Sequence, residues 1–278
     1  MQPLVLEPVR ESARFLTFKR VGDVRHALTA LAAGPWDVDN IIGFGAPVTP
    51  AVEPFPAHFG QFPSTQSALW LSTQLKEKGA QLDAAMKIAR TLRGVFEIVE
   101  EVDAFTYLGG RDLSGFVDGT ENPMGDKATE AAVIHGRGPG LDGGSYVAVQ
   151  RFVHDLEALD RMSALARDHV FGRRFEDDEE SADAPLSSHV KRTAQESFDP
   201  PAFMVRRSMP YGGVKEHGLY FVAYVETVDR FARVLRRMAG TDDGIVDGML
   251  SFTRAVTGGY YFVPPLVDGR LDLRALGM

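Results

Sequence analysis

The chain has 278 residues, no cysteine and a formal net charge of −8, from 30 basic and 38 acidic side chains. The acidic balance, with no run rich in Lys or Arg, argues against a nucleic-acid partner and against an anionic membrane surface. The lack of cysteine excludes disulfides, thiolate metal sites, iron–sulfur clusters and thiol catalysis. No apolar stretch approaches twenty residues, and no basic segment followed by an apolar run opens the chain. We therefore expect a cytoplasmic protein.

Hydrophobic periodicity predicts two halves of similar build. The first half has predicted strands at 13–20, 40–45, 68–75 and 96–107, with helices at 24–33 and 81–92. The second has predicted strands at 145–153, 203–209, 219–226 and 260–263, with helices at 155–168, 228–238 and 245–256. Each half approximates β-α-β-β-α-β, the ferredoxin-like arrangement. The sequence thus predicts an α+β protein of two ferredoxin-like halves with antiparallel sheets, divided as residues 1–122 and 123–278.

Two segments fall outside this pattern. Residues 108–144 are rich in Gly, Asp, Asn and Pro, which are turn and loop residues, and so long a loop is usually functional or disordered. Residues 171–201 carry the acidic run Glu176–Glu180, which we interpret as a solvated face. The chain has no phosphate-binding Gly-x-x-x-x-Gly-Lys-Ser/Thr loop and no His-Glu-x-x-His zinc helix.

The first candidate for chemistry is Asp118, in the loop Gly115-Phe-Val-Asp-Gly-Thr-Glu-Asn-Pro123. Taken alone, its Asp-Gly and Asn-Pro pairs are ordinary turn signals, and a plain turn is the simpler interpretation. An acidic side chain on such a loop can nevertheless be presented to a cavity.

The second candidate is Arg206, in the predicted strand at 203–209. Strand alternation places Met204, Arg206 and Ser208 on one face. A basic side chain among apolar neighbours is costly to bury unless a negative group pairs with it. An edge-strand arginine in solvent is an equally good interpretation of the sequence. The seven histidines form no metal pair by spacing, and His189 lies in a loop-like region.

Several segments, taken in order, resemble the dye-decolourising peroxidases, closest to their compact bacterial class B. They are Gly115-Phe-Val-Asp-Gly-Thr-Glu-Asn-Pro123, Phe171-Gly-Arg173, Ser188-His-Val-Lys-Arg192, Arg206-Arg-Ser-Met-Pro-Tyr-Gly212, Phe252-Thr-Arg-Ala-Val-Thr-Gly-Gly259 and Phe262-Val-Pro-Pro265. The likeness covers nearly the whole chain. It implies a fold of the dimeric α+β barrel type, with haem b held mainly by the C-terminal half.

The resemblance also implies roles for particular residues. It assigns His189 as the axial ligand of the haem iron, and it puts Asp118 and Arg206 on the opposite, peroxide-binding face. Three further residues of the Asp118 loop are implied to run along the haem, and they are Glu121, Asn122 and Pro123. Arg173 is the candidate partner of a haem propionate. Ser208 stands where many relatives have Asn, and could order a water beside the iron.

Chemistry accounts for these residue types. Ferric haem needs one strong axial donor, and a carboxylate on the other ring nitrogen of that histidine strengthens it. Family members use an acidic residue late in the chain, for which Asp247 is the candidate. Asp118 could move a proton between the two peroxide oxygens, and Arg206 could stabilise the charge on the departing oxygen.

The implied activity is a haem b peroxidase that uses hydrogen peroxide to oxidise phenolic, dye-like or other one-electron donors through an oxyferryl intermediate. The alternatives are a haem-handling protein for storage, transfer or iron release on the same fold and, more remotely, a related α+β barrel enzyme without haem. Homo-oligomers are usual in the family. We do not expect an encapsulating nanocompartment as partner, because residues 266–278 do not resemble a long targeting tail.

Overall fold

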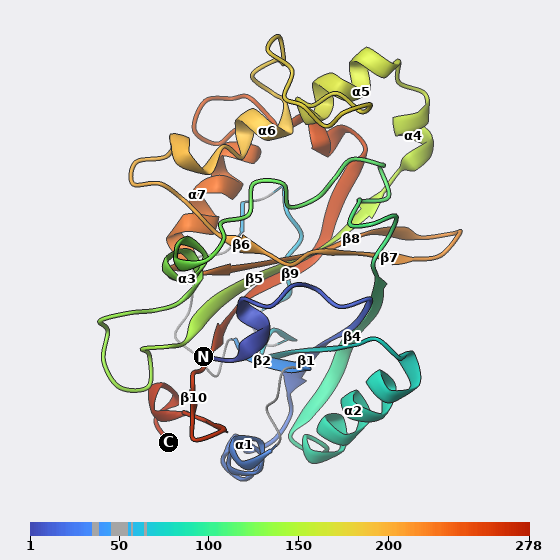
Figure 1. The fold of residues 1–278 in the computed structure, drawn as a ribbon. Helices are drawn as coiled ribbons and strands as arrows, with labels where there is room; N and C mark the ends of the chain where they lie inside the picture. Colours follow the sequence, from blue (N-terminus) through green and yellow to red (C-terminus); the bar gives the residue numbers. More distant parts are fainter. Residues whose placement is uncertain (35–38, 46–54, 57, 64–65) are drawn as a thin grey trace.

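The computed structural model describes residues 1–278 apart from 35–38, 46–54, 57 and 64–65 (Figure 1). Strands from both parts of the chain join into one antiparallel sheet at the centre, and helices lie outside it. None of the helices in the described ranges is long and apolar enough to cross a membrane.

The first half follows the predicted order. Its elements are β1 Ser12–Arg20, α1 Val24–Ala33, β2 Asn40–Phe44, β3 Leu69–Leu75, α2 Lys78–Thr91 and β4 Phe96–Phe105. The strands lie in the order β2-β3-β1-β4, with all neighbours antiparallel. The apolar sides of α1 and α2 pack on one face of this sheet, where Leu16, Phe18, Leu28 and Leu71 are buried.

The second half repeats this order with more insertions. Its elements are β5 Ser145–His154, α4 Leu156–Asp160, α5 Ala164–Phe171, α6 His189–Arg192, β6 Val205–Arg206, β7 Met209–Gly212, β8 His217–Val225, α7 Val228–Met238 and β9 Thr253–Val263. The strands lie in the order β7-β8-β5-β9. Both halves are thus ferredoxin-like, as the sequence predicts.

The two halves close on each other into a barrel. Phe44 of β2 pairs with Phe262 of β9, and Ala104 of β4 pairs with Tyr211 of β7. Aromatic side chains from both halves fill the inside, where the rings of Phe15 and Tyr220 stack at 4.1 Å. Because the interior is packed, any large site must lie on an outer face of the barrel.

Two predicted helices differ from the structure. The helix predicted at 245–256 is wrong: only Gly248–Ser251 forms a short 3-10 turn, and Thr253–Val263 is one long strand. Residues 253–256 read as helical locally, but they pair with β5 from Thr253 opposite His154 onward, and this pairing overrides local periodicity. The helix predicted at 155–168 is broken, because the Ser163 hydroxyl accepts a hydrogen bond from Ala166 and starts a new helix.

The strand predicted at 203–209 is also interrupted, since β6 and β7 are separated at Arg207 and Ser208. The loop predicted at 108–144 contains a short helix, α3 Asp126–Ala132. The boundary predicted between residues 122 and 123 falls inside this connection and stays a prediction. Residues 266–271 form a small hairpin, with β10 Leu266–Val267 and β11 Arg270–Leu271.

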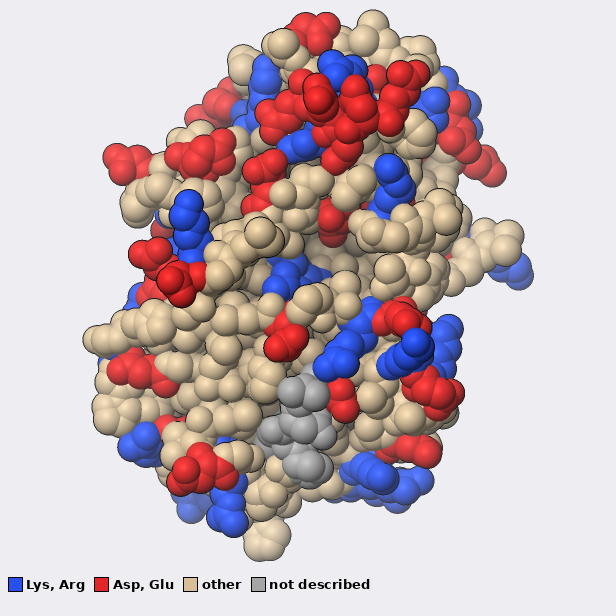
Figure 2. Space-filling model, in the orientation of Figure 1, with Lys and Arg blue, Asp and Glu red and all other residues tan. Residues whose placement is uncertain are grey.

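The acidic run Glu176–Glu180 is largely solvent-exposed, as predicted. In Figure 2, acidic side chains gather at the top of the molecule, over the segment that joins α5 to α6. Arg174 binds two of them, with 2.7 Å to Asp177 and 2.9 Å to Glu179. Below this acidic area the same view shows a hollow with basic side chains at its edge.

Candidate functional site

A mainly apolar cavity lies between the outer face of β5 and β8 and the helix α7. Its empty space, which is continuous with solvent at the opening, is about 870 Å³. Its wall is mainly apolar and aromatic, and includes Phe116, Phe152, Phe171, Leu219, Phe221 and Phe231. We call this space the main cavity. A more polar outer cleft shares its wall at Phe116, Asp118, Phe171, His189, Thr193, Gln195 and Arg206.

His189 lies on one side of the main cavity, at the first residue of α6. Its Nδ1 is 2.8 Å from the Asp247 carboxylate, whose side chain is fully buried. With Nδ1 engaged by an acceptor, Nε2 is the nitrogen that remains for a ligand in the cavity. The structure therefore contains the His189–Asp247 pair that was expected from the sequence.

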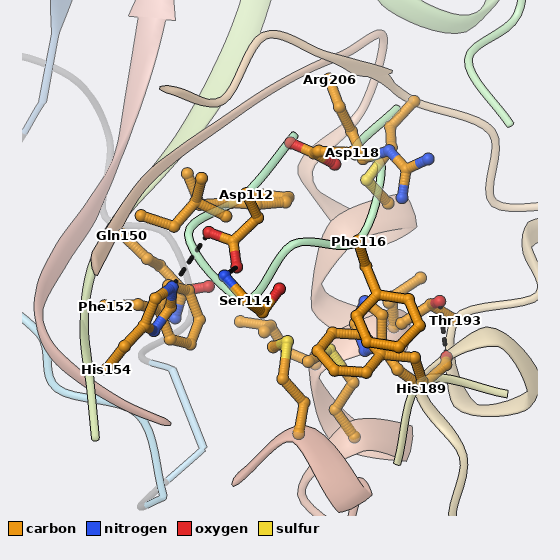
Figure 3. A pocket seen from close by; sticks show the side chains of 18 of the residues that line it. Asp112, Ser114, Phe116, Asp118, Gln150, Phe152, His154, His189, Thr193 and Arg206 are labelled. Atoms are coloured by element: carbon orange, nitrogen blue, oxygen red, sulfur yellow. Dashed lines mark hydrogen bonds and ion pairs between the residues drawn. The ribbon is translucent and has the colours of Figure 1, made fainter. Parts of the chain in front are cut away.

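Backbone bonds hold both partners of this pair in place. The His189 carbonyl accepts from the Thr193 hydroxyl at 2.7 Å (Figure 3). Asp247 donates its N–H to Met238 O at 2.8 Å, and its second carboxylate oxygen accepts from Met249 N at 2.9 Å. Neither ring nor carboxylate can turn freely, so the direction of the free imidazole nitrogen is fixed.

Asp118 and Arg206 lie together across the cavity from His189 (Figure 3). No hydrogen bond or ion pair between these two described side chains occurs in the structure. The Arg206 Nε is buried and has no hydrogen-bond partner. A buried donor without a partner is costly, so this geometry favours a polar ligand that accepts from Arg206 inside the cavity.

The residue after Asp118 has to be glycine. Gly119 has φ +81°, and a Cβ there would lie 2.9 Å from Asn122 Nδ2. The loop turns sharply at this point, which leaves room for the Asn122 amide beneath it. The Asp118 loop thus carries its acid on a tightly defined backbone.

Asn122 does not line the main cavity or the outer cleft, although it was expected to run along the haem. Its amide instead binds both backbone groups of Arg206. Asn122 Oδ1 accepts from Arg206 N at 2.8 Å, and Nδ2 donates to Arg206 O at 3.0 Å. This pair of bonds joins the Asp118 loop to β6 and so brings Asp118 beside Arg206.

Replacing Asn122 by alanine should leave the Arg206 N–H and C=O without these partners. We expect a loss of about 1–3 kcal/mol in the free energy of unfolding, measured by urea denaturation. Thr120→Ala, an exposed position of the same loop, is the control and should change stability by less than about 0.5 kcal/mol. Equal stability of the two variants would contradict the role given to Asn122.

Ser208 does not share the main cavity with Arg206, despite the predicted alternation. It lies on a small separate cavity with Asp118, Tyr107 and Pro210. Its hydroxyl accepts from Val222 N at 3.4 Å. The break between β6 and β7 falls at Arg207 and Ser208, which is why the two-residue period stops there. Any water ordered by Ser208 would contact Asp118 from this small cavity and not from the main cavity.

Charged side chains surround the outer cleft. Arg173 lies there and binds Glu121 at 2.9 Å and Glu180 at 3.0 Å. Its side chain is only 13% exposed, so it is a cation held near the entrance. Lys191 also lines this cleft. Pro123, expected to run along the haem, lines neither space.

The sequence reasoning missed six polar residues of the main cavity, two of which, Thr193 and Gln195, also line the outer cleft. Gln150 and His154 on β5 face it together with Phe152, and Asp112 and Ser114 face it from the segment before Asp118. The available signal was that Gln150 and His154 are polar and fall on the strand face that also carries Ala148 and Phe152, since alternate residues of a strand share a face. His189 is the metal-binding side chain in this cavity that has a free nitrogen. No group of three or more metal-binding side chains occurs among the described residues.

Known proteins resemble this chain in sequence and in fold. The model of the Dyp-type peroxidase C-terminal family matches residues 109–268, more than half of the chain. A dye-decolorizing peroxidase of Mycolicibacterium paratuberculosis is 35% identical over 208 residues, 73% of this chain and 59% of the relative. One of Rhodococcus erythropolis is 31% identical and covers 95% of this chain and 86% of its own length. The chain spans about 60% of the length of the mycobacterial relatives.

Solved structures agree over the full chain. A dye-decolorizing protein from V. cholerae has a TM-score of 0.85 and 32% identity, covering 100% of this chain and 99% of that one. A variant of DypB from Rhodococcus jostii in complex with heme has a TM-score of 0.84 and 28% identity. The match covers 94% of this chain and 95% of that one. Fold, site geometry and sequence likeness point the same way, and the chain belongs to the Dyp-type peroxidase family.

Proposed function

We propose that the protein is a haem b peroxidase that uses hydrogen peroxide to oxidise phenolic, dye-like or other one-electron donors. One observation carries the proposal. An imidazole held by a buried carboxylate faces an aspartate and an arginine across an apolar cavity. The proposal agrees with the family, and with the solved relative whose structure contains heme.

The residues present fit a haem group. Haem needs an apolar space with one strong axial donor, and the main cavity supplies aromatic walls and His189. Its propionates need cations near solvent, and Arg173 and Lys191 lie on the outer cleft. Arg173 would exchange a surface carboxylate, Glu121 or Glu180, for a propionate. When bound, the haem iron supplies the redox centre at which peroxide is reduced.

The side chains opposite His189 then handle peroxide. With haem bound, Asp118 would be placed to take a proton from one peroxide oxygen and pass it to the other, and the haem would supply the electrons that reduce peroxide. Arg206 would donate a hydrogen bond through its unpartnered Nε and so stabilise negative charge on a peroxide oxygen. Asp247 keeps the His189 ring oriented and strengthens it as a donor.

Further parts of the proposal follow the family resemblance. They are a cytoplasmic location, assembly as a homo-oligomer, and small-molecule electron donors that react from the edge of the site. The alternative of a haem-handling protein is not favoured, because the relatives that match are named as peroxidases.

A spectrum of the purified protein tests the proposal. After haemin is added, we expect a Soret band typical of histidine-ligated haem, and a rapid change of that band with one equivalent of hydrogen peroxide. Adding a phenolic donor should return the starting spectrum with catalytic turnover. A preparation that stays colourless with haemin would contradict haem binding, and a Soret band that ignores peroxide would contradict the peroxidase activity.

A further inference from the structure

A second carboxylate–imidazole pair lies on the wall of the main cavity, and the proposed reaction does not use it. Asp112 precedes the Asp118 loop, and His154 is the last residue of β5. His154 Nε2 is 3.1 Å from Asp112 Oδ1 (Figure 3). Both residues are buried, with 9% and 7% of their surface exposed. A buried pair of this kind requires either a chemical or a structural role.

The hydrogen bonds leave no free nitrogen on this histidine. His154 Nδ1 is 2.7 Å from the Thr253 hydroxyl, and that hydroxyl lies 3.1 Å from Val153 O. Thr253 is the first residue of β9. An ionised Asp112 only accepts, so Nε2 must carry the proton that joins the pair.

The carboxylate is equally occupied. Asp112 Oδ2 accepts from Ser114 N at 2.8 Å, while Oδ1 takes the imidazole. Burial by itself raises the pKa of Asp112, but the bonds from His154 and Ser114 outweigh it and hold that pKa below its ordinary value. Both ring nitrogens of His154 and both carboxylate oxygens of Asp112 therefore have a hydrogen-bond partner. This closed arrangement suits an anchor better than an acid or base, which needs a free atom facing its substrate.

The anchor attaches to the segment that carries Asp118. Asp112 N donates to Phe116 O at 2.9 Å, and Gly115 N donates to Asp112 O at 2.9 Å. Asp118 N, two residues beyond Phe116, lies 3.3 Å from Gly110 O. Among the hydrogen bonds of the described residues, Asp112 is the one side chain of this turn that bonds to β5. Through His154 it is also connected to β9. At its other end the loop is joined to β6 by Asn122.

We propose that Asp112 and His154 are positioning residues: together with Thr253 they anchor residues 110–118 to β5 and β9 and so fix Asp118 over the main cavity. The consequence for catalysis rests on the proposed function, while the anchoring of the loop does not. A carboxylate that must reach a peroxide oxygen tolerates little displacement, since a misplacement of about 1 Å can cost roughly a hundredfold in rate.

The hydrogen-bond pattern predicts an unusual rescue. Asn at position 112 can accept from Ser114 N with its oxygen and donate to a neutral His154 with its nitrogen. His154 would then donate from Nδ1 to Thr253, which still donates to Val153 O, so each bond is kept. Ala at position 112 keeps neither bond. An anchor therefore tolerates Asp112→Asn and fails with Asp112→Ala, whereas a proton-transferring Asp112 fails with both.

The first test is amide hydrogen exchange of the haem-free full chain, read on peptides that cover residues 110–119. For Asp112→Ala we expect exchange roughly five- to a hundredfold faster, the range for a lost buried hydrogen bond, with little change for Asp112→Asn. Asp142→Ala is the matched control, because that carboxylate also accepts from a backbone N–H, at 2.7 Å from Arg137, but lies outside the cavity. Thr253→Val is a milder second variant should Asp112→Ala not fold, and it should also speed exchange. Unchanged exchange in the variants that fold would overturn the proposal.

The second test uses the haem-loaded chain. Asp112→Ala should lower the rate constant for peroxide about ten- to a hundredfold, with the Soret band and the shape of the pH profile unchanged, and Asp112→Asn should restore most of it. Loss of activity in Asp112→Asn together with loss of one limb of the pH profile would overturn positioning in favour of proton transfer. If the chain binds no haem at all, the proposed function fails, but the exchange experiment still decides the anchor.

Discussion

Replacing His189 by alanine is expected to remove stable haem binding. His189 supplies the free imidazole nitrogen on its side of the main cavity, and Asp247 holds its ring in place. Loss of a partner behind a ligand typically weakens metal affinity about 10–100-fold, and loss of the ligand itself should exceed that range. Haemin titration followed by the Soret band measures the change.

Two further variants make this result specific. His217→Ala removes a half-buried histidine of β8 whose side chain bonds to Gly213 O and lines neither the main cavity nor the outer cleft, and this variant should bind haem as the unchanged chain does. Asp247→Asn should keep haem but weaken its retention by about 10–100-fold, because the ring loses its charged partner. If His189→Ala kept a normal histidine-ligated spectrum, another residue would be the axial ligand.

Replacing either Asp118 or Arg206 is expected to slow the reaction with peroxide by about 100–1000-fold while haem stays bound. Asp118→Asn keeps the shape of the side chain and removes the base. Arg206→Leu removes the donor whose Nε has no partner in the cavity. Stopped-flow absorbance at varied peroxide concentration measures each rate constant. The double variant should be little slower than either single variant, because the two side chains act on one bond.

Matched surface substitutions separate this effect from a change of net charge. Asp126→Asn changes an exposed aspartate at the start of α3, and Arg174→Leu changes an arginine that binds only surface carboxylates. Both should react with peroxide at the rate of the unchanged chain. If Asp118→Asn and Arg206→Leu turned over peroxide normally but altered haem transfer, the peroxidase proposal would fail and haem handling would replace it.

The sequence by itself determined the class of fold and the main candidates. Runs of β-branched and aromatic residues marked most strands, and helices 24–33 and 228–238 were predicted at the bounds they have in the structure. These features are local in sequence, so neighbouring residues carry the information. Asp118, Arg206 and His189 became the main candidates through the family resemblance, because the local patterns around them also allow plainer interpretations.

Only the tertiary structure decided the features that depend on long-range pairing. Thr253–Val263 is a strand because β5 lies beside it, although its first residues read as a helix. Asn122 binds the backbone of Arg206, 84 residues away, and Ser208 faces a separate cavity because the strand breaks before it. The Asp112–His154 pair left almost no sequence signal. Its partners are 42 residues apart, and a hydrogen bond between distant segments exists only once the sheet has brought them together.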